Sequence, residues 1–345
     1  MSVPVPACPA RPRPCPGAAA RATGALCAAL AAAAGVALWL AAPAAATPPV
    51  AQPGHAAVTL KLATWNMEWF LTPATFNSLK GHCTRDEGSH RWNPRSIPCD
   101  VAATLERSST DLDGMVQVAK RLDADVVAIE EVDGAEAAAQ VFRAYRFCFT
   151  GGHEVQNTGF AIRRGLPYRC GPDLMELSLG DQLRRGATLV LFPGTPRELH
   201  LLAVHLKSGC ARGSLESHAR ACARLARQAP ALREWIAAQQ RAGHRFAVLG
   251  DFNRELQHEH GAGLWSRIGA DGPGKPLLNT ADGEAFRNCF PGQTHTGYID
   301  YILLGPALAP TLQRGSFERL AYSAVDAWRL KLSDHCPVAV RLRLD

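Results

Sequence analysis

The sequence of 345 residues contains no C-x-x-C pair and no H-E-x-x-H stretch. Structural zinc sites of the finger type and zinc-peptidase helices therefore have little support. The stretch QHEHG at residues 257–261 carries two histidines and a glutamate but lacks that spacing, and we interpret it as a surface loop. No internal repeat is present, and no low-complexity tract occurs beyond the first 46 residues. These absences favour an ordinary globular domain over a repeat protein.

The chain also lacks a strong charge of either sign. Its 37 Lys and Arg residues and 31 Asp and Glu residues give a formal net charge of +6. The first 46 residues contain three Arg and no acidic residue, so the remainder carries +3. A charge this small does not by itself indicate a nucleic-acid-binding protein. The apolar fraction of 47% is ordinary for a globular protein with one large domain or two small ones.

Residues 1–46 are typical of a secretory signal peptide. Three arginines form a basic start, an Ala- and Leu-rich run follows, and the small residues of APAAA end the segment. An uncleaved membrane anchor is the alternative, because the apolar run is nearly long enough to span a bilayer. We expect a Pro-rich spacer over residues 47–55 and the folded domain over residues 56–345. The chain is therefore predicted to be secreted or periplasmic.

Cysteine is frequent beyond the predicted signal. Eight of the 11 cysteines lie after residue 46. An even number in an exported chain favours disulfides, although the sequence alone allows many connectivities. We expect sequential pairing, because the first and third pairs bracket loop-like or helix-entry stretches. The expected pairs are Cys83–Cys99, Cys148–Cys170, Cys210–Cys222 and Cys289–Cys336.

Strand-like apolar runs recur from residue 58 to the end of the chain, with helical spacing between some of them. The runs span residues 58–67, 125–132, 158–164, 186–192, 199–208, 245–253, 298–304 and 337–344. Strands and helices that alternate without an interior linker predict one α/β domain.

Two helical segments and one long loop are predicted between these runs. The apolar spacing from Leu112 to Leu122 indicates a helix before the second run. Residues 215–240 form a longer helical region, which we expect Pro230 to divide because proline cannot donate the helical hydrogen bond. Residues 76–100 show no period, and we interpret them as a long loop closed by two cysteines.

Polar residues stand where several of the apolar runs end. They are Asn66, Glu68, Glu130, Glu131, His205, Lys207, Asp251, Asn253, Asp300, Asp334 and His335. A single residue of this kind is usually a cap or turn residue. Six such strand ends indicate a shared site, because buried charges are costly unless they are paired or bind a metal. Carboxylate and amide oxygens suit Mg²⁺ or Mn²⁺, and histidines beside acids suit proton transfer. These groups together predict metal-assisted hydrolysis of a phosphate ester by water.

The order N…E…HLK…GDFN…ID…SDH resembles the endonuclease/exonuclease/phosphatase superfamily, which includes DNase I, exonuclease III-type repair nucleases and neutral sphingomyelinases. The GDFN stretch and the terminal SDH are the most specific motifs, and the resemblance covers nearly the whole chain after the predicted signal. It implies a four-layered α/β sandwich, with two mostly antiparallel sheets between outer helices and the site at one edge. It also implies a divalent cofactor, Mg²⁺ or Mn²⁺.

On the metal side, the resemblance implies that Asn66 and Glu131 hold the ion and that Asp334 completes the set. One departure adjoins these residues. Glu130 stands where relatives usually have Gln, so it either adds a charge beside the ligands or is a solvated neighbour.

On the reaction side, the resemblance implies that Asp251 orients or deprotonates the attacking water and that Asn253 holds a phosphate oxygen. His335 would act as base or phosphate contact, with Asp300 fixing its tautomer. His205 matches the histidine that protonates the leaving oxygen in the DNase I and sphingomyelinase branches.

Two assignments stay open at this point. Arg184 falls where many relatives carry a phosphate-binding arginine, but Arg185 could be the matching residue instead. In DNase I a glutamate supports the acid histidine from a strand that matches NTGFAI here, and this stretch contains no glutamate. The partner of His205 is therefore not assigned.

These residues favour an exported, metal-dependent phosphodiesterase that acts as a monomer on nucleic acid. Two rivals share the fold: a sphingomyelinase-like enzyme acting on a membrane lipid, and a sugar or inositol phosphatase. An exposed apolar hairpin near the site would favour the lipid enzyme. A rival of another class is a non-catalytic secreted binding module, which the intact set of site residues opposes.

Overall fold

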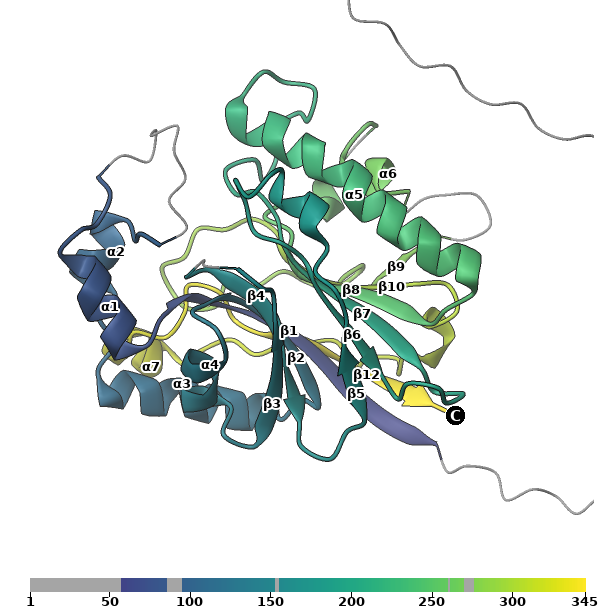
Figure 1. Ribbon diagram of the computed structural model, residues 1–345, viewed down its shortest axis with the longest axis horizontal. Coiled ribbons are helices and arrows are strands. Elements are labelled where there is room, and N and C mark those ends of the chain that lie inside the picture. Colours follow the sequence, from purple (N-terminus) through teal and green to yellow (C-terminus); the bar gives the residue numbers. More distant parts are fainter. Residues whose placement is uncertain (1–56, 86–94, 153–154, 260, 270–275) are drawn as a thin grey trace, which may run out of the picture. The chain divides into compact units, whose positions relative to one another are not determined.

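The fold is built from two six-stranded sheets in a computed structural model of the chain (Figure 1). The structure describes residues 57–85, 95–152, 155–259, 261–269 and 276–345. The predicted signal peptide and spacer, residues 1–55, lie outside the described residues. Within the described part, no helix has the length and apolar character that crossing a membrane requires.

The first sheet has the strand order β11-β12-β1-β2-β4-β3. Its strands are β1 (Val58–Phe70), β2 (Val126–Val132), β3 (Tyr145–Phe149), β4 (Asn157–Arg163), β11 (Glu318–Arg319) and β12 (Val338–Leu344). The second sheet has the order β5-β6-β7-β8-β10-β9. Its strands are β5 (Tyr168–Cys170), β6 (Ala187–Leu191), β7 (Leu199–His205), β8 (Phe246–Asp251), β9 (Leu278–Asn279) and β10 (Asp300–Leu304). All eight predicted runs form strands, and the strands that the runs missed are short ones of two to five residues.

Each sheet contains one parallel pair near its centre, and its other pairs are antiparallel. β1 lies parallel to β2, and β7 lies parallel to β8. Two parallel neighbours run in one direction, so their carboxyl ends lie at the same edge of the sheet. Each sheet therefore has two strand ends side by side at one of its edges.

Apolar clusters join the sheets and helices into four layers. The central cluster lies between the two sheets and includes Leu62 from the first and Leu201 from the second. Helices α3 (Ser109–Leu122) and α4 (Ala135–Val141) pack on the outer face of the first sheet. Helix α5 (Arg220–Ala242) packs on the outer face of the second (Figure 1). The predicted four-layered α/β sandwich is confirmed.

The remaining helices are short. They are α1 (Pro73–Lys80), α2 (Cys99–Thr104), α6 (Leu264–Arg267) and α7 (Ala324–Arg329), with 3₁₀ turns η1 (Met175–Ser178), η2 (Leu256–His258) and η3 (Ala309–Thr311). The predicted loop over residues 76–100 is wrong at both ends, since α1 extends into it and α2 begins before its end. Thr72 accepts a hydrogen bond from the amide of Thr75, and Pro73 occupies the first turn. A cap followed by proline was the local signal for α1.

Helix α5 departs from the prediction because Pro230 does not divide it. Pro230 is exposed, whereas Leu225, Leu232 and Ile236 are buried against the second sheet. The missing hydrogen bond therefore costs less than the burial of that apolar face gains, and the helix continues through the proline.

All four expected disulfides are present: Cys83–Cys99, Cys148–Cys170, Cys210–Cys222 and Cys289–Cys336. The third links the segment after β7 to the first turn of α5. The fourth attaches the residue that follows His335 to the segment before β10.

Candidate active site

The ends of the two parallel pairs meet at one edge of the sandwich. Asn66 from β1 donates through Nδ2 to Glu131 Oε1 (3.2 Å), at the end of β2. The same nitrogen donates to Asp251 Oδ2 (3.0 Å), at the end of β8 in the other sheet. His205 Nε2, at the end of β7, lies 3.5 Å from Glu131 Oε1 and 3.6 Å from Asp251 Oδ2. Four predicted site residues thus form one cluster across both sheets.

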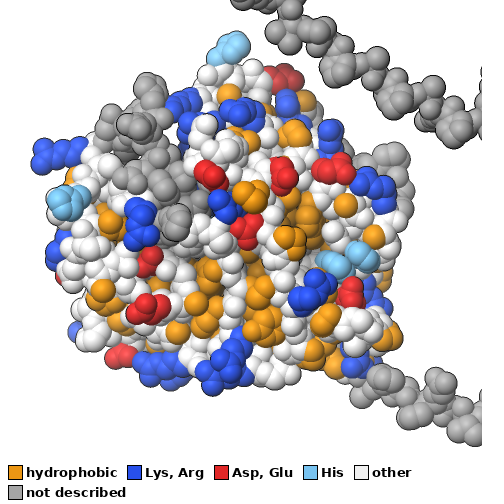
Figure 2. Space-filling view, in the orientation of Figure 1, with side chains coloured by type: hydrophobic (Ala, Val, Ile, Leu, Met, Phe, Trp, Pro, Cys, Tyr) orange, Lys and Arg blue, Asp and Glu red, His pale blue; other side chains and the backbone are white. Residues whose placement is uncertain are grey.

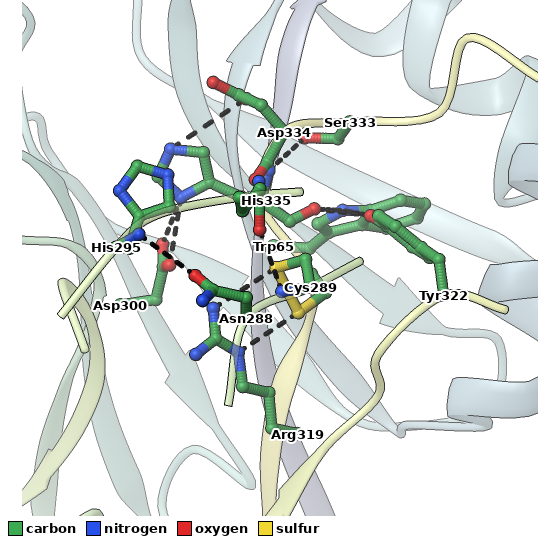
Figure 3. The surroundings of a disulfide bond; sticks show 12 residues. Trp65, Asn288, Cys289, His295, Asp300, Arg319, Tyr322, Ser333, Asp334 and His335 are labelled. Carbon is green, nitrogen blue, oxygen red and sulfur yellow. Dashed lines mark hydrogen bonds and ion pairs between the residues drawn. A yellow bond between two sulfur atoms is a disulfide. The ribbon is translucent and has the colours of Figure 1, made fainter. Parts of the chain in front are cut away.

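Two further predicted residues reach this edge on antiparallel strands. Asp300 is the first residue of β10 and lies directly opposite Asp251 in the register. His335 precedes β12, and its Nδ1 lies 2.9 Å from Asp300 Oδ2. Its Nε2 lies 3.9 Å from Asp251 Oδ2 and 4.0 Å from Asp334 Oδ1, so the ring stands between Asp300 and Asp334 (Figure 3). The expected fixing of His335 by Asp300 has the required geometry.

The backbone at this edge adopts conformations that side chains rarely allow. Glu68, Trp69, Glu131 and Asn253 have φ between 45° and 60°, in the left-handed region. The pairing of β1 with β2 shifts register beyond Asn66, which indicates a bulge. Each such residue costs of order 1–3 kcal/mol and commonly stands at a functional site. The bulge brings the Trp69 amide to Glu131 Oε2 (3.1 Å) and holds that carboxylate at the site.

Glu68 lies among the predicted metal ligands, although the family resemblance assigned it no role. Its amide donates to Asn66 Oδ1 (3.0 Å), and its Oε2 accepts from the amide of Asp334 (3.0 Å). Burial, and then the charge of Asp334, raise the pKa of Glu68 to about 7. The available sequence signal was its position two residues after Asn66 at a strand end. Crowded hard oxygen donors whose ionisation is this costly fit a divalent cation, which would neutralise them.

Asp251 is held by a set of amide donors. The backbone amide of Asn253 donates to Oδ1 (2.7 Å), and Asn253 Nδ2 donates to Oδ2 (2.9 Å). Burial raises the pKa of Asp251 to about 7, so this carboxyl can exchange a proton near neutral pH. Asn253 Nδ2 also donates to the Leu206 carbonyl (3.2 Å). Its predicted contact with a phosphate oxygen stays a prediction.

The two site histidines have opposite charge preferences. Burial, and then the charge of Arg184, lower the pKa of His205 well below its usual value. Burial also disfavours the cation at His335, but Asp300 and Asp251 outweigh it and raise that pKa well above its usual value. Near neutral pH His335 is therefore an imidazolium and His205 is neutral. This favours the phosphate-contact role for His335, and the acid role of His205 stays a prediction.

The structure decides between the two arginines. Arg184 is buried and donates to the carbonyl of Leu206 (2.9 Å), next to His205. Arg185 instead forms ion pairs with Asp173 (3.4 Å) and Asp181 (2.9 Å). Arg184 is therefore the arginine beside His205, and its binding of a phosphate stays a prediction. No hydrogen-bond partner for His205 Nδ1 is present among the described residues.

Glu130 is fully buried, so the alternative of a solvated neighbour is wrong. Its side chain alternates with that of Glu131 and points between the sheets, where Thr64 Oγ1 donates to it (3.1 Å). Burial, and then the charges of Asp300 and Asp251, raise the pKa of Glu130 well above its usual value. A protonated Glu130 matches the shape and neutrality of the glutamine that relatives usually have there.

We expect Glu130→Gln to stabilise the metal-free protein at neutral pH. In the unfolded chain Glu130 ionises near its usual pKa, whereas the folded protein retains the proton to higher pH, so native stability falls as pH rises between those values. The difference in free energy of unfolding between Glu130→Gln and the parent should vanish near pH 4.5, the usual pKa of a glutamate. Above that pH the difference should grow by at most about 1.4 kcal/mol per pH unit. Urea unfolding from pH 5 to 8 measures it, with exposed Glu136→Gln as control. A pH-independent difference would show that native Glu130 is ionised.

The QHEHG stretch is only partly the surface loop that we expected. His258 is exposed, but the Glu259 side chain is buried in an ion pair with Arg254. Its carboxylate also accepts from the amides of Leu264 (2.7 Å) and Trp265 (2.6 Å) at the start of α6. Glu259 therefore caps a helix and holds Arg254, whereas His260 lies outside the described residues.

Comparisons with known proteins agree with this architecture. The family model described as "Endonuclease/Exonuclease/phosphatase family" matches residues 63–335. Comparison with curated sequences gives no significant match. Among solved structures, a family protein from Bacteroides thetaiotaomicron is similar with 14% identity and a TM-score of 0.53, covering 84% of this chain and all of that one.

Two further structures are similar at the level of the fold. D. rerio TDP2, solved with a single-strand DNA product, has 16% identity and a TM-score of 0.50, with 82% of this chain and 98% of that one covered. ANGEL2, a 2',3'-cyclic phosphatase solved with adenosine-2',3'-vanadate, has 17% identity and a TM-score of 0.50, with 84% and 96% covered.

The fold and the site define a metal-dependent phosphoric ester hydrolase. The chain belongs to the endonuclease/exonuclease/phosphatase family.

Proposed function

We propose that the chain is an exported phosphodiesterase that uses Mg²⁺ or Mn²⁺ to hydrolyse nucleic acid. Export is supported by the signal-like residues 1–46 and by the four disulfides, which persist in oxidising compartments. The choice of nucleic acid rests on basic side chains that adjoin His205.

Lys207 follows His205 by two residues and lies among arginines. Burial, and then the charges of Arg184, Arg224 and Arg220, lower the pKa of Lys207 to about 8. Arg220 and Arg224 stand in the first turns of α5, which contain no acidic residue to offset them. Lys and Arg side chains also lie over α5 on the face shown in Figure 2.

Cations crowded in this way repel one another, and a bound polyanion relieves the repulsion. A nucleic acid carries phosphates on both sides of the bond that is cleaved, so one neighbouring phosphate can meet this cluster while the reacting phosphate lies at Asp251 and His335. A sphingomyelin headgroup brings one phosphate and a quaternary ammonium, which these cations would repel. The basic cluster of Arg184, Lys207, Arg220 and Arg224 therefore favours a nuclease.

In the proposed reaction, the residues of the site have different roles. Asn66, Glu68, Glu131 and Asp334 would hold the divalent ion, which neutralises charge that develops on the phosphate. Asp251, with a pKa of about 7, is suited to orient water and accept its proton.

The two histidines contribute on the phosphate. His335, held by Asp300, presents a cationic Nε2–H, which can donate to a phosphate oxygen. In this proposal the neutral His205 ring donates a hydrogen bond from its N–H to the leaving oxygen and stabilises the charge that develops there. Arg184 lies beside it and adds positive charge near the phosphate.

The purified chain with Mg²⁺ is expected to cleave DNA or RNA faster than sphingomyelin vesicles or a simple phosphomonoester. EDTA should abolish the activity, and Mg²⁺ or Mn²⁺ should restore it. Cleavage that survives chelation would contradict the metal assignment. Preferential hydrolysis of vesicles or of the monoester would overturn the nuclease proposal while leaving the enzyme class intact.

Arg224→Ala tests the basic cluster itself. We expect a several-fold higher KM for DNA, a smaller dependence on salt, and an unchanged rate on bis(p-nitrophenyl) phosphate, which has no flanking phosphate. Arg241→Ala is the matched control, because Arg241 lies at the other end of α5 and pairs with Glu234. Equal effects of the two variants would remove the cluster from substrate binding.

One observation favours the lipid enzyme as a second candidate. Val325 and Trp328, on α7, are 59% and 81% exposed. They lie three residues apart and precede Asp334 closely in the chain, and exposed apolar side chains beside a site suit contact with a membrane surface. Loss of vesicle hydrolysis, but not of DNA cleavage, in Trp328→Ala would support this candidate.

A further inference from the structure

Two histidines and a glutamate form a compact cluster far from the active site. Glu198 and His200 lie at the start of β7, and His244 precedes β8. His200 and His205 are five residues apart on one strand, so about 17 Å separates the cluster from the site. Adjoining histidine side chains are visible at the surface in Figure 2, with an acidic side chain beside them.

The three side chains are brought together by the sheet. Glu198 and His200 alternate with Leu199 and therefore project from the same face. The amide of His200 donates to the carbonyl of Arg245 (3.0 Å), which places His244 beside it. One ligand atom from each of Glu198, His200 and His244 lies within 4.8 Å of the others.

Neighbouring groups hold these side chains by hydrogen bonds. Gly194 N–H donates to Glu198 Oε2 (2.6 Å), and Glu198 Oε1 lies 2.9 Å from His200 Nε2. His244 Nδ1 lies 2.9 Å from Gln239 Oε1. An amide oxygen only accepts, so Nδ1 carries the hydrogen, and Nε2 of the neutral ring has its lone pair available.

We propose that Glu198, His200 and His244 form a second metal site, specific for a late transition-metal ion such as Zn²⁺ or Ni²⁺. Two imidazoles and one carboxylate suit these ions better than Mg²⁺. Two ligand atoms about 2.1 Å from a tetrahedral ion lie about 3.4 Å apart. His200 Nε2 and Glu198 Oε1, now 2.9 Å apart, therefore need to separate only slightly to hold one. A pocket of about 290 Å³ opens beside His200, and Trp235 and Gln239 are among its other lining residues.

Binding requires two local changes. The rings of His200 and His244 are stacked at 4.0 Å and inclined by only 6°, so one ring must turn about its Cβ–Cγ bond to point its nitrogen at the ion. The ion also takes the place of the hydrogen between His200 Nε2 and Glu198 Oε1, so the hydrogen of the His200 ring moves to Nδ1 when the ion is bound.

Isothermal titration of the full chain with Zn²⁺, in saturating Mg²⁺, tests the proposal. We expect His200→Ala and His244→Ala each to bind one Zn²⁺ fewer than the parent, or to bind it with an affinity at least ~10-fold lower. Loss of a residue that only supports a metal ligand already lowers affinity by that much. His218→Ala, at an exposed histidine before α5, is the control and should match the parent.

Hydrolysis with Mg²⁺ should not change in the same variants, which separates this site from the catalytic one. Zn²⁺ stoichiometry that is equal in the parent and in folded His244→Ala would overturn the proposal, as would the absence of any Zn²⁺ equivalent beyond the catalytic site. His244 precedes the strand, so its variant tests the site even if His200→Ala, within β7, fails to fold.

Discussion

Asp251→Ala and His335→Ala should each lower turnover at least ~10²-fold while the protein remains folded. Asp251 lies where both sheets meet, within 4 Å of His205 and His335, and three N–H groups of Asn66 and Asn253 aim its oxygens. Removing the carboxylate leaves no group in that place to take a proton from water. Removing the His335 ring deletes the cation that Asp300 positions.

Turnover under saturating substrate and Mg²⁺ measures these effects, and circular dichroism establishes folding. Asp251→Asn is the sharper variant, because it keeps the shape and removes the charge. Burial raises the folded pKa of Asp251 to about 7, so its ionisation lowers native stability as pH rises from its unfolded value, near 4, towards 7. Asp251→Asn should therefore be inactive yet, without metal, more stable than the parent at pH 7. Near-normal turnover in a well-folded variant would remove that residue from the mechanism.

Replacing Cys289 and Cys336 together by Ser should destabilise the protein by about 4 kcal/mol and lower its turnover. The disulfide closes 47 residues, and the chain-entropy estimate for a loop of that size gives this value. The melting temperature should fall by roughly 10 °C. Because Cys336 directly follows His335, release of this tether should also loosen the catalytic ring.

The surroundings of this disulfide explain the expected coupling. Arg319 lies against both sulfurs, with Nε 3.1 Å from Cys336 Sγ and an Nη 3.2 Å from Cys289 Sγ (Figure 3). Its guanidinium also covers the rings of Phe286 (4.7 Å) and Tyr298 (5.1 Å). The disulfide is thus part of the packing beneath His335.

The pair Cys83 and Cys99 provides the matched control. Its loop of 16 residues should contribute about 3 kcal/mol, but it lies between α1 and α2 and should leave turnover unchanged in the folded fraction. Thiol counting on the unfolded, unreduced protein checks the premise of both variants. Eight free thiols would contradict the disulfides and the proposed export together.

The sequence by itself determined the elements and most of the site. Apolar runs are local features of the sequence, so they identified the strands. Asn66, Glu131, His205 and Asp251 were identified as site residues because they are polar and stand where those strands end. The apolar spacing from Leu112 to Leu122 identified α3 for the same reason. The order of these motifs was sufficient for the family because each motif occupies a few consecutive residues.

The tertiary structure determined the properties that depend on residues distant in the sequence. The burial of Glu130 and the opposite charges of His205 and His335 follow from neighbours on other strands, because desolvation and Coulomb interactions act through space. The choice of Arg184 over Arg185 required side-chain directions that the sequence does not encode locally. Pro230 remained helical because the sheet beneath α5 outweighs a local preference, which only packing can reveal.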